Sequence, residues 1–533
     1  MKTSLPSLPS CRFGRRHLPR ALTTLIHTAA AVAIVGFSTL TALSGEPKNP
    51  PNVVVILVDD LGYGDVKCLN PEGKIATPRI DRLAADGMIF TDAHSSSSVC
   101  TPTRYGILTG RYNWRSRLKS GVLGGYSRPL IEPGRLTIAQ LARQHGYVTA
   151  CVGKWHLGMD MPLKDGGVAD DKANFGKGYA KAWDVDYAGK IAGGPNAVGF
   201  DYYFGISASL DMSPYVFIEN DRFTAVPTKE KKIVRLGPAA DDFEAVKVLP
   251  TLTEKAVAFI REHASADRDQ PPFLLYFPLN APHAPIEPTD EWRGKSGIND
   301  YADFVMQVDD TVGRVLDALN DRGAADDTLV ILTSDNGCSP VADLKTLAAH
   351  GHQPSYVFRG AKADIYDGGH RIPFIARWPD KVQAGGQSDA LVCLTDVMAT
   401  FADLIGETLP ADAAEDSVSI LPALLGKAEP PRREAIVHHS INGSFSIRQG
   451  NWKLELCRDS GGWSAPKPGS KEAAGLPPVQ LYDLAADIGE RHNLYDEHPE
   501  VVERLTALLD KYVADGRSTP GMPQPNTTPV HVH

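Results

Sequence analysis

Cysteine is scarce in this sequence, and its spacing argues against two common kinds of protein. Among the 533 residues there are seven cysteines, of which Cys11 lies close to the N-terminus. The six that follow are spread singly along the chain without any CxxC pair. This pattern favours neither a zinc-cysteine site nor a disulfide framework, although one or two disulfide bonds are still compatible with it.

Long apolar runs are also lacking, except near the N-terminus. Residues 1–44 combine five basic residues with an apolar run from about residue 21 to residue 43, followed by a small-x-small ending at Ser44. His27, Thr28 and Ser38 interrupt the run, which favours a cleaved signal peptide over a membrane anchor. We therefore expect export to the periplasm or the extracellular space, by general secretion or a twin-arginine route, and no stable membrane span after cleavage.

An excess of positive charge is absent as well. The formal net charge is −9, and removal of residues 1–44, with five basic residues and no acidic ones, lowers it to −14. Such an acidic protein is not expected to bind nucleic acid through bulk charge. An anionic substrate would have to be held by a local basic pocket.

Buried strands alternate with amphipathic helices through most of the chain. Helices are expected at residues 78–87, 136–145, 253–263 and 301–319, and one further helix starts at Cys100. Continuous apolar, often β-branched segments predict strands at residues 52–58, 147–153, 273–277 and 328–334. This order predicts an α/β fold with a large, mostly parallel central sheet sandwiched by helices.

The pattern changes after about residue 430. Short strands are expected at 435–437, 445–448 and 452–456, followed by a helix at 499–515 and a frayed proline-rich tail from Pro520. We therefore divide the chain into a signal peptide (1–44), a catalytic domain (45–430) and a smaller C-terminal domain with an antiparallel sheet (431–533). Residues 159–250 are irregular, which is typical of insertions that shape a binding cleft.

Cys100 stands at the start of an expected helix, behind four serines. Pro102 fits the first turn, and Arg104 follows one turn later, so that both Cys100 and Arg104 can face one pocket. A helix start offers free N–H groups to an anion, which would suit a nucleophilic cysteine of lowered pKa. A buried structural cysteine is the other interpretation of the same pattern.

Acidic and amide side chains follow two of the core strands. Asp59 and Asp60 come after the first strand, and Asp335 and Asn336 after the strand at 328–334. Ligands of open α/β sheets bind at the carboxyl ends of the strands, where these oxygens would meet. Oxygen donors without His or Cys suit Ca²⁺, or less well Mg²⁺, although each pair alone would also fit a turn.

Basic side chains follow other strands toward the same edge. Lys154 and His156 come after the strand at 147–153, His283 after 273–277, and Arg359 and Lys362 lie in a later loop. Any one of them alone could be a surface or structural residue. Together with a hard cation they are suited to cleaving an anionic ester, where negative charge accumulates in the transition state.

Five motifs in this order resemble the type I, formylglycine-dependent sulfatases of the alkaline phosphatase superfamily. They are CTPTR at residues 100–104 for C-x-P-x-R, LTGR at 108–111, GKWHLG at 153–158, DNG at 335–337, and LYDL at 481–484 with NL at 493–494. The resemblance spans roughly residues 50–510. Three positions depart from the usual family pattern: Thr103, Ile488 and Asp367.

The resemblance implies a role for each site residue. Cys100 would be oxidised to formylglycine by a formylglycine-generating enzyme or an anaerobic maturase, and its hydrate would attack sulfur to give a covalent sulfate hemiester. The family pattern assigns metal binding to Asp59, Asp60, Asp335, Asn336 and the converted Cys100.

The remaining roles fall on basic residues. The resemblance implies that Arg104 and Lys154 stabilise the hydrate and that Lys362 binds a sulfate oxygen. It also implies that His283 protonates the leaving alcohol and that His156 is the base of the second step.

The substrate is expected to be a sulfated small molecule or polysaccharide, for example one with a sulfated galactose or N-acetylgalactosamine unit. Asp211, Tyr215, His350 and His352 are candidate sugar contacts, although a plain loop role fits each equally well. Two alternatives share the pattern: a formylglycine-type phosphodiester or phosphonate monoester hydrolase, and an inactive glycan-binding pseudo-sulfatase. The intact charged set argues against the second.

Overall fold

The computed structural model describes residues 50–170, 181–266, 270–379, 381–427 and 433–532. The expected signal peptide at residues 1–44 lies outside these ranges. Within them, no helix combines the length and the apolar character that a bilayer crossing requires.

The central element is a mixed, mostly parallel sheet, which has ten strands among the described residues. Its middle strand β1 (Asn52–Asp59) is fully buried and pairs in parallel with β10 and β11, so that Val54 lies between Leu275 and Val330. The two ends of the sheet include antiparallel pairs. The order is β13 (Gly386–Ser388), β2 (Met88–Phe90), β12 (Phe374–Arg377), β11 (Thr328–Ser334), β1, β10 (Phe273–Pro282), β4 (Val148–Lys154), β5 (Tyr202–Ile206), β6 (Ile218–Glu219) and β7 (Arg222–Phe223).

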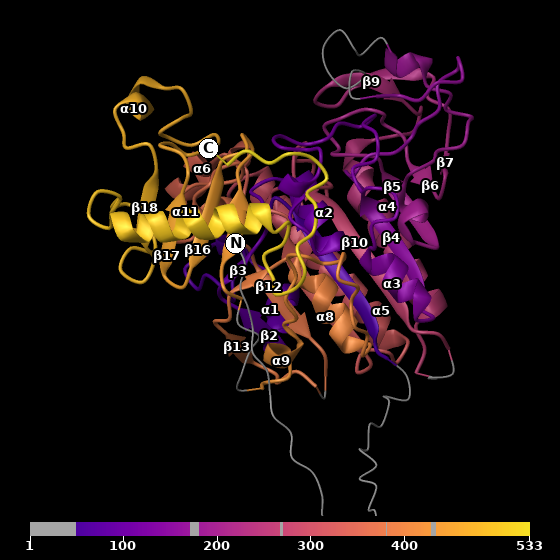
Figure 1. Cartoon of the computed structure of the whole chain (residues 1–533). Coiled ribbons are helices and arrows are strands. Elements are labelled where there is room, and N and C mark those ends of the chain that lie inside the picture. The colour runs from indigo at the N-terminus through magenta and orange to yellow at the C-terminus, as the bar shows by residue number, and fades with distance from the viewer. Residues whose placement is uncertain (1–49, 171–180, 267–269, 380, 428–432, 533) are drawn as a thin grey trace, which may run out of the picture. The chain divides into compact units, whose positions relative to one another are not determined.

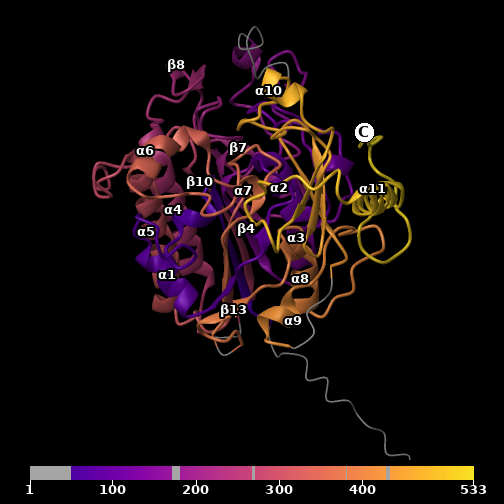
Figure 2. The same cartoon turned by 90° about the vertical axis from the view of Figure 1, so that its left-hand side faces the viewer.

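Helices cover both faces of this sheet, as Figure 2 shows in a view along its edge. One face carries α1 (Pro78–Ala85), α4 (Ala245–His263) and α5 (Asp300–Asp321). The other carries α2 (Cys100–Thr109), α3 (Ile138–Gln144) and α8 (Asp396–Leu404). The strands read as continuous apolar runs because both of their faces are buried. The expected α/β sandwich is confirmed.

A second, antiparallel sheet follows near the C-terminus (Figure 1). Its apolar residues form a core of their own, against which α11 (Pro499–Ala514) packs over β16 and β17. The division at residue 430 stays a prediction. The strands, in order, are β15 (Ile436–His439), β16 (Phe445–Gln449), β17 (Trp452–Glu455) and β18 (Gln480–Asp483).

The tail after Pro520, which was expected to be frayed, is hydrogen-bonded to the rest of the protein. Buried Arg115 donates from Nη1 to Asn526 Oδ1 at 3.0 Å, and its carbonyl oxygen accepts from Thr527 N at 2.9 Å. Arg111 donates to Pro525 O at 3.0 Å. Arg111 and Arg115 each pair with a buried carboxylate. Their remaining N–H groups and the carbonyl oxygen of Arg115 can therefore bind the tail.

One strand of the central sheet, β5, and one helix that covers it, α4, differ from the expectation. β5 lies in the segment that was expected to be irregular, because its five residues are too few to show a period. Helix α4 begins at Ala245 rather than at residue 253, and so contains Pro250. Burial of its apolar residues against the sheet offsets the hydrogen bond that proline cannot make.

Candidate active site

The polar residues expected at the carboxyl ends of four core strands do come together. Asp59 is the last residue of β1 and Asp60 follows it, and Asp335 and Asn336 follow β11, the strand paired beside it. The two ends are joined directly, because Asp60 N donates to Asp335 Oδ1 at 3.2 Å and Asn336 Nδ2 donates to Asp60 Oδ1 at 2.7 Å. All four residues are almost completely buried.

Each of the three carboxylates is paired with a cation. Arg104 donates from Nη2 to Asp335 Oδ2 at 2.7 Å, and its Nη1 donates to the carbonyl oxygen of Lys154 at 2.8 Å. Lys154 Nζ donates to Asp59 Oδ2 at 2.7 Å, and Lys362 Nζ to Asp60 Oδ2 at 2.8 Å. The three cations come from α2, β4 and the loop after Gly360, so three distant segments meet here.

The surroundings shift the pKa values of Asp59 and Asp335 in opposite directions. Burial alone would raise the pKa of Asp59, but Lys154, His283 and Arg104 hold that pKa far below its usual range. Burial and the nearby Asp59 raise the pKa of Asp335 to about 6, although Arg104 opposes the shift. Burial alone would lower the pKa of Lys362, but the negative charge of Asp60 raises it, and the pKa lies above its usual range.

Two backbone positions at the site are strained. Asp60 has φ of 68° and His156 has φ of 58°, both in the left-handed region that residues with a Cβ seldom adopt. Such conformations cost of order 1–3 kcal/mol and persist where surrounding contacts fix them. Asp60 and His156 lie just after the extended strands β1 and β4. Their left-handed backbone conformation changes the direction of the chain, and with it the direction of the two side chains.

Cys100 is the first residue of α2 and is 2% exposed. Burial raises the pKa of its thiol, although Lys154 and Lys362 act in the opposite direction. The structure therefore argues against the interpretation of Cys100 as a thiolate nucleophile of lowered pKa. It leaves a protonated side chain, placed by the start of the helix in the field of two lysines.

The two site histidines differ in their surroundings. His156 is buried, and its Nε2 lies 2.7 Å from the carbonyl oxygen of Leu123, while its Nδ1 has no hydrogen-bond partner. His283 is partly exposed at 12%, with Nε2 3.7 Å from Asp60 Oδ2 and Nδ1 2.6 Å from the carbonyl oxygen of Ala284. Burial lowers the pKa of both rings, with Lys154 adding to the effect at His156 and Lys362 at His283.

The donor set fits a hard divalent cation. Oδ1 of Asp59 and Oδ1 of Asn336 are buried and lack any hydrogen-bond partner, which is costly for polar atoms. Asp60 adds a further carboxylate within 4.8 Å of an Asp59 oxygen. Carboxylate and amide oxygens without thiolates are the ligands that Ca²⁺ and Mg²⁺ select.

Of the candidate sugar contacts, Asp211 and Tyr215 lie next to each other. Tyr215 is buried, and its hydroxyl donates to the carbonyl oxygen of Asp211 at 3.3 Å. His352 is buried with both ring nitrogens engaged, by Asp65 Oδ1 at 2.8 Å and by Lys74 N at 3.0 Å. These two residues therefore have structural roles. Asp211 pairs with Arg235 at 3.2 Å, and His350 is exposed.

One supporting residue was not expected from the sequence. Ser209 Oγ lies 3.3 Å from each ring nitrogen of His283 and lies in the segment after β5. No periodicity or motif marks that segment. Only the position of β5 beside β4 could have suggested that the residues after it reach the same edge of the sheet.

The three departures from the family pattern lie away from the carboxylates. Thr103 Oγ1 donates to the carbonyl oxygen of Ser97 at 3.0 Å, and Ile488 is exposed. Asp367 pairs with Lys453 at 2.9 Å and with Arg371 at 3.0 Å, in a separate buried network.

Comparisons with known proteins agree with this geometry. A family model described as Sulfatase matches residues 51–407. The N-acetylgalactosamine-6-O-sulfatase of Bacteroides thetaiotaomicron is 34% identical, covering 88% of this chain and 94% of that protein. Human arylsulfatase A is 32% identical, covering 86% of this chain and 87% of its own length.

A solved structure gives the same result. It comes from work on glycosaminoglycan metabolism by Bacteroides thetaiotaomicron, and it superimposes with a TM-score of 0.74 at 33% identity. The match covers 87% of this chain and 99% of that one.

A hard cation at this site should stabilise the protein. After chelation and dialysis, added Ca²⁺ should raise the thermal midpoint, with a stabilisation of about 2.7 kcal/mol at a concentration 100 times the dissociation constant. Asp59→Asn should lose this increase, since it removes a ligand charge, whereas Asp290→Asn, on the exposed surface, should keep it. An equal increase in Asp59→Asn would contradict the assignment, and Mg²⁺ in parallel measures the preference.

Proposed function

The chain belongs to the sulfatase family and is a sulfuric ester hydrolase, and from this premise we propose that it removes sulfate from a sulfated carbohydrate. The observation that carries the proposal is the closed set of three carboxylates, three cations and two histidines around the first residue of α2. The name of the Bacteroides relative, an N-acetylgalactosamine-6-O-sulfatase, favours a sulfated amino sugar as the substrate.

We propose that the nucleophile is formylglycine, made from Cys100 by a maturation enzyme that supplies the oxidant. Its hydrate would attack sulfur and take the sulfate as a covalent hemiester. CTPTR at residues 100–104 supports this conversion, and the raised pKa of the Cys100 thiol leaves little thiolate to act instead. Arg104 and Lys154, both buried, can hold the two oxygens of the hydrate.

The remaining steps are proton transfers that named side chains can perform. When the bond between sulfur and the sugar oxygen breaks, the oxygen keeps the electron pair and takes a proton from His283. In the second step His156 Nδ1, which has no partner, can accept the proton of the remaining hydroxyl while sulfate leaves and the aldehyde returns. Lys362 is placed to hold a sulfate oxygen.

We assign the cation at the site as Ca²⁺, with Mg²⁺ as the alternative. Asp59, Asp60, Asp335 and Asn336 would hold it, together with an oxygen of the converted Cys100. When bound, the cation supplies positive charge that offsets the negative charge accumulating on the sulfate oxygens.

A panel of esters tests the substrate class. We expect kcat/KM for 6-sulfated N-acetylgalactosamine to exceed that for the matching 6-phosphate by at least about tenfold, or about 1.4 kcal/mol in transition-state binding. Aryl sulfate, aryl phosphate and phenylphosphonate esters complete the panel. A preference for phosphorus would support a phosphodiester or phosphonate hydrolase instead, and no turnover of any ester by converted protein would support a pseudo-sulfatase.

The role of His283 is tested by changing the leaving group. His283→Gln should lower kcat for a sugar sulfate by about 10²–10⁴-fold, because an alkoxide needs a proton to leave. An activated aryl sulfate, whose phenolate leaves without help, should lose much less. His350→Gln, at an exposed histidine, is the control. Equal losses on both substrates would show that His283 does not act as the acid.

We also propose that the protein is exported, since residues 1–44 carry the pattern of a signal peptide. N-terminal sequencing of the protein from the periplasm or the medium should give a start near residue 45. A mature protein that still begins at Met1, found with the cytosol, would contradict the proposal.

A further inference from the structure

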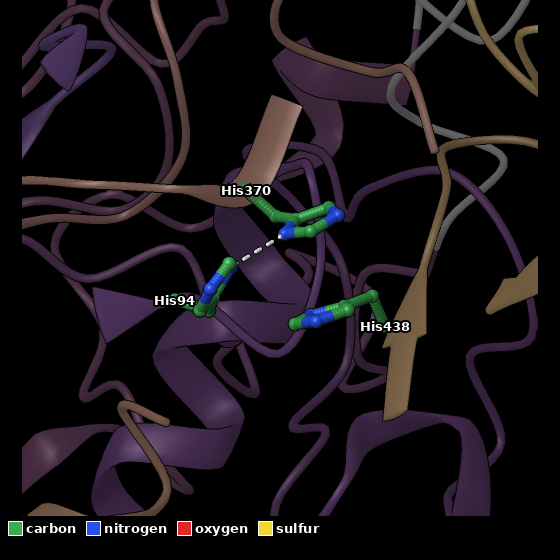
Figure 3. A group of neighbouring side chains, drawn as sticks. All are labelled: His94, His370 and His438. Atoms are coloured by element: carbon green, nitrogen blue, oxygen red, sulfur yellow. Dashed lines mark hydrogen bonds between the residues drawn. The ribbon is translucent and has the colours of Figure 1, made fainter. Parts of the chain in front are cut away.

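A second cluster of ligating side chains lies outside the carboxylate site. His94 comes from β3 (Ala93–His94), His370 from α7 (Asp367–His370), and His438 from β15. All three are fully buried, and one ring nitrogen of each lies within 4.8 Å of the other two (Figure 3). The sulfatase chemistry proposed above uses none of them.

The outward nitrogen of each ring faces a hydrogen-bond acceptor. His94 Nε2 lies 2.9 Å from Asp92 Oδ1, and His370 Nε2 lies 3.0 Å from the carbonyl oxygen of Ile365. His438 Nδ1 lies 3.1 Å from the carbonyl oxygen of Ser95. Histidines that bind a metal almost always donate their other N–H to a carboxylate or a backbone carbonyl in this way.

The inward nitrogens lack suitable partners. If the outward nitrogens carry the protons, then Nδ1 of His94 and Nδ1 of His370 face each other as lone pairs at 3.0 Å. The third inward nitrogen, Nε2 of His438, is buried without a hydrogen-bond partner. Burial also lowers the pKa of all three rings.

A metal-free arrangement resolves only part of this problem. Lys453 Nζ lies 3.2 Å from His370 Nε2 and 3.0 Å from the carbonyl oxygen of Ile365. If Lys453 donates to both, His370 can carry its proton on Nδ1 and donate to His94. His438 Nε2 is still left without a partner, which is unfavourable for a buried polar group.

We propose that His94, His370 and His438 bind a divalent transition metal ion, most suitably Zn²⁺. Three neutral imidazoles are a common zinc ligand set, and one shared ion would satisfy all three inward nitrogens at once. Carboxylates lie behind two rings, since Asp92 accepts from His94 and Asp367 Oδ1 is 3.8 Å from His370 Nε2. Each carboxylate is also paired with basic side chains, Asp92 with Arg371 and Arg448, and Asp367 with Lys453 and Arg371.

Binding requires one movement. The rings of His370 and His438 are stacked, with centroids 3.7 Å apart and planes 11° from parallel. Lone pairs in parallel rings do not converge, so the His438 ring must turn out of the stack to share an ion. Its inward nitrogen has no hydrogen bond to lose in that turn.

The ion would join segments that are far apart in the sequence. It would link β3 and α7 to the C-terminal sheet, next to the serines that lead into α2. Ser95 N donates to the carbonyl oxygen of His370 at 2.8 Å, and Ser98 N donates to that of His439 at 3.1 Å. A structural metal here would fix the chain just before Cys100 without touching the substrate.

Metal analysis of the intact, calcium-loaded protein tests the proposal. After dialysis against zinc and then a weak chelator, elemental mass spectrometry should find about one Zn²⁺ per chain, and X-ray absorption should show nitrogen ligands at about 2.0–2.1 Å. His438→Gln removes one of the three proposed ligands and should lower the zinc content at least about tenfold. Changes to the residues that only orient a metal ligand already weaken metal binding by about this factor. His439→Gln changes the neighbouring buried histidine and should keep the zinc.

A second variant separates the two sites. Asp59→Asn should lose calcium and keep zinc, whereas His438→Gln should do the reverse. The proposal would be overturned if Asp59→Asn lost zinc while His438→Gln kept it. It would also be overturned if the wild-type protein retained no zinc, or if its zinc had only oxygen ligands. If His438→Gln does not fold, the X-ray absorption spectrum of the wild-type protein decides, because oxygen and imidazole shells differ.

Discussion

The site depends on the electrostatic balance between three buried carboxylates and three buried cations. Asp59, Asp60 and Asp335 lie close together at the ends of β1 and β11, and burial opposes the ionisation of Asp59 and Asp335. Arg104, Lys154 and Lys362 compensate, each through a charge-assisted hydrogen bond. Lys154 and Arg104 lower the pKa of both Asp59 and Asp335 and so favour their charged forms.

This balance explains why the fold brings together such distant segments. Arg104 comes from the helix that begins with Cys100, Lys154 from the end of β4, and Lys362 from the loop before α7. Buried ion pairs contribute little net stability, since desolvation consumes most of the Coulomb attraction. A network of this size is therefore better understood as the arrangement that ligand binding and catalysis need, with stability supplied by the apolar strands beneath it.

The sequence predicted the site better than its surroundings. Asp59, Asp335, Lys154 and His283 follow apolar strands, and the rule that ligands bind at the carboxyl ends of such strands brought them to one edge. Arg104 followed from its helical spacing from Cys100. The roles assigned to all of them stay predictions that came from the family resemblance rather than from periodicity.

Other features could not be read from sequence, because they depend on contacts between distant segments. β5 and Ser209 lie in a stretch without period, and the C-terminal tail is held by Arg111 and Arg115, about four hundred residues earlier in the chain. The three clustered histidines lie far apart from one another in the sequence. They become neighbours because β3, α7 and β15 meet at one point of the fold.

The most direct test of the account is mass spectrometry of the peptide that contains Cys100, on protein of measured specific activity. The account predicts an aldehyde at this position, in a fraction that rises and falls in proportion to sulfatase activity across preparations made with and without the maturation enzyme. Full sulfatase activity in protein that carries only the unmodified Cys100 thiol would contradict it.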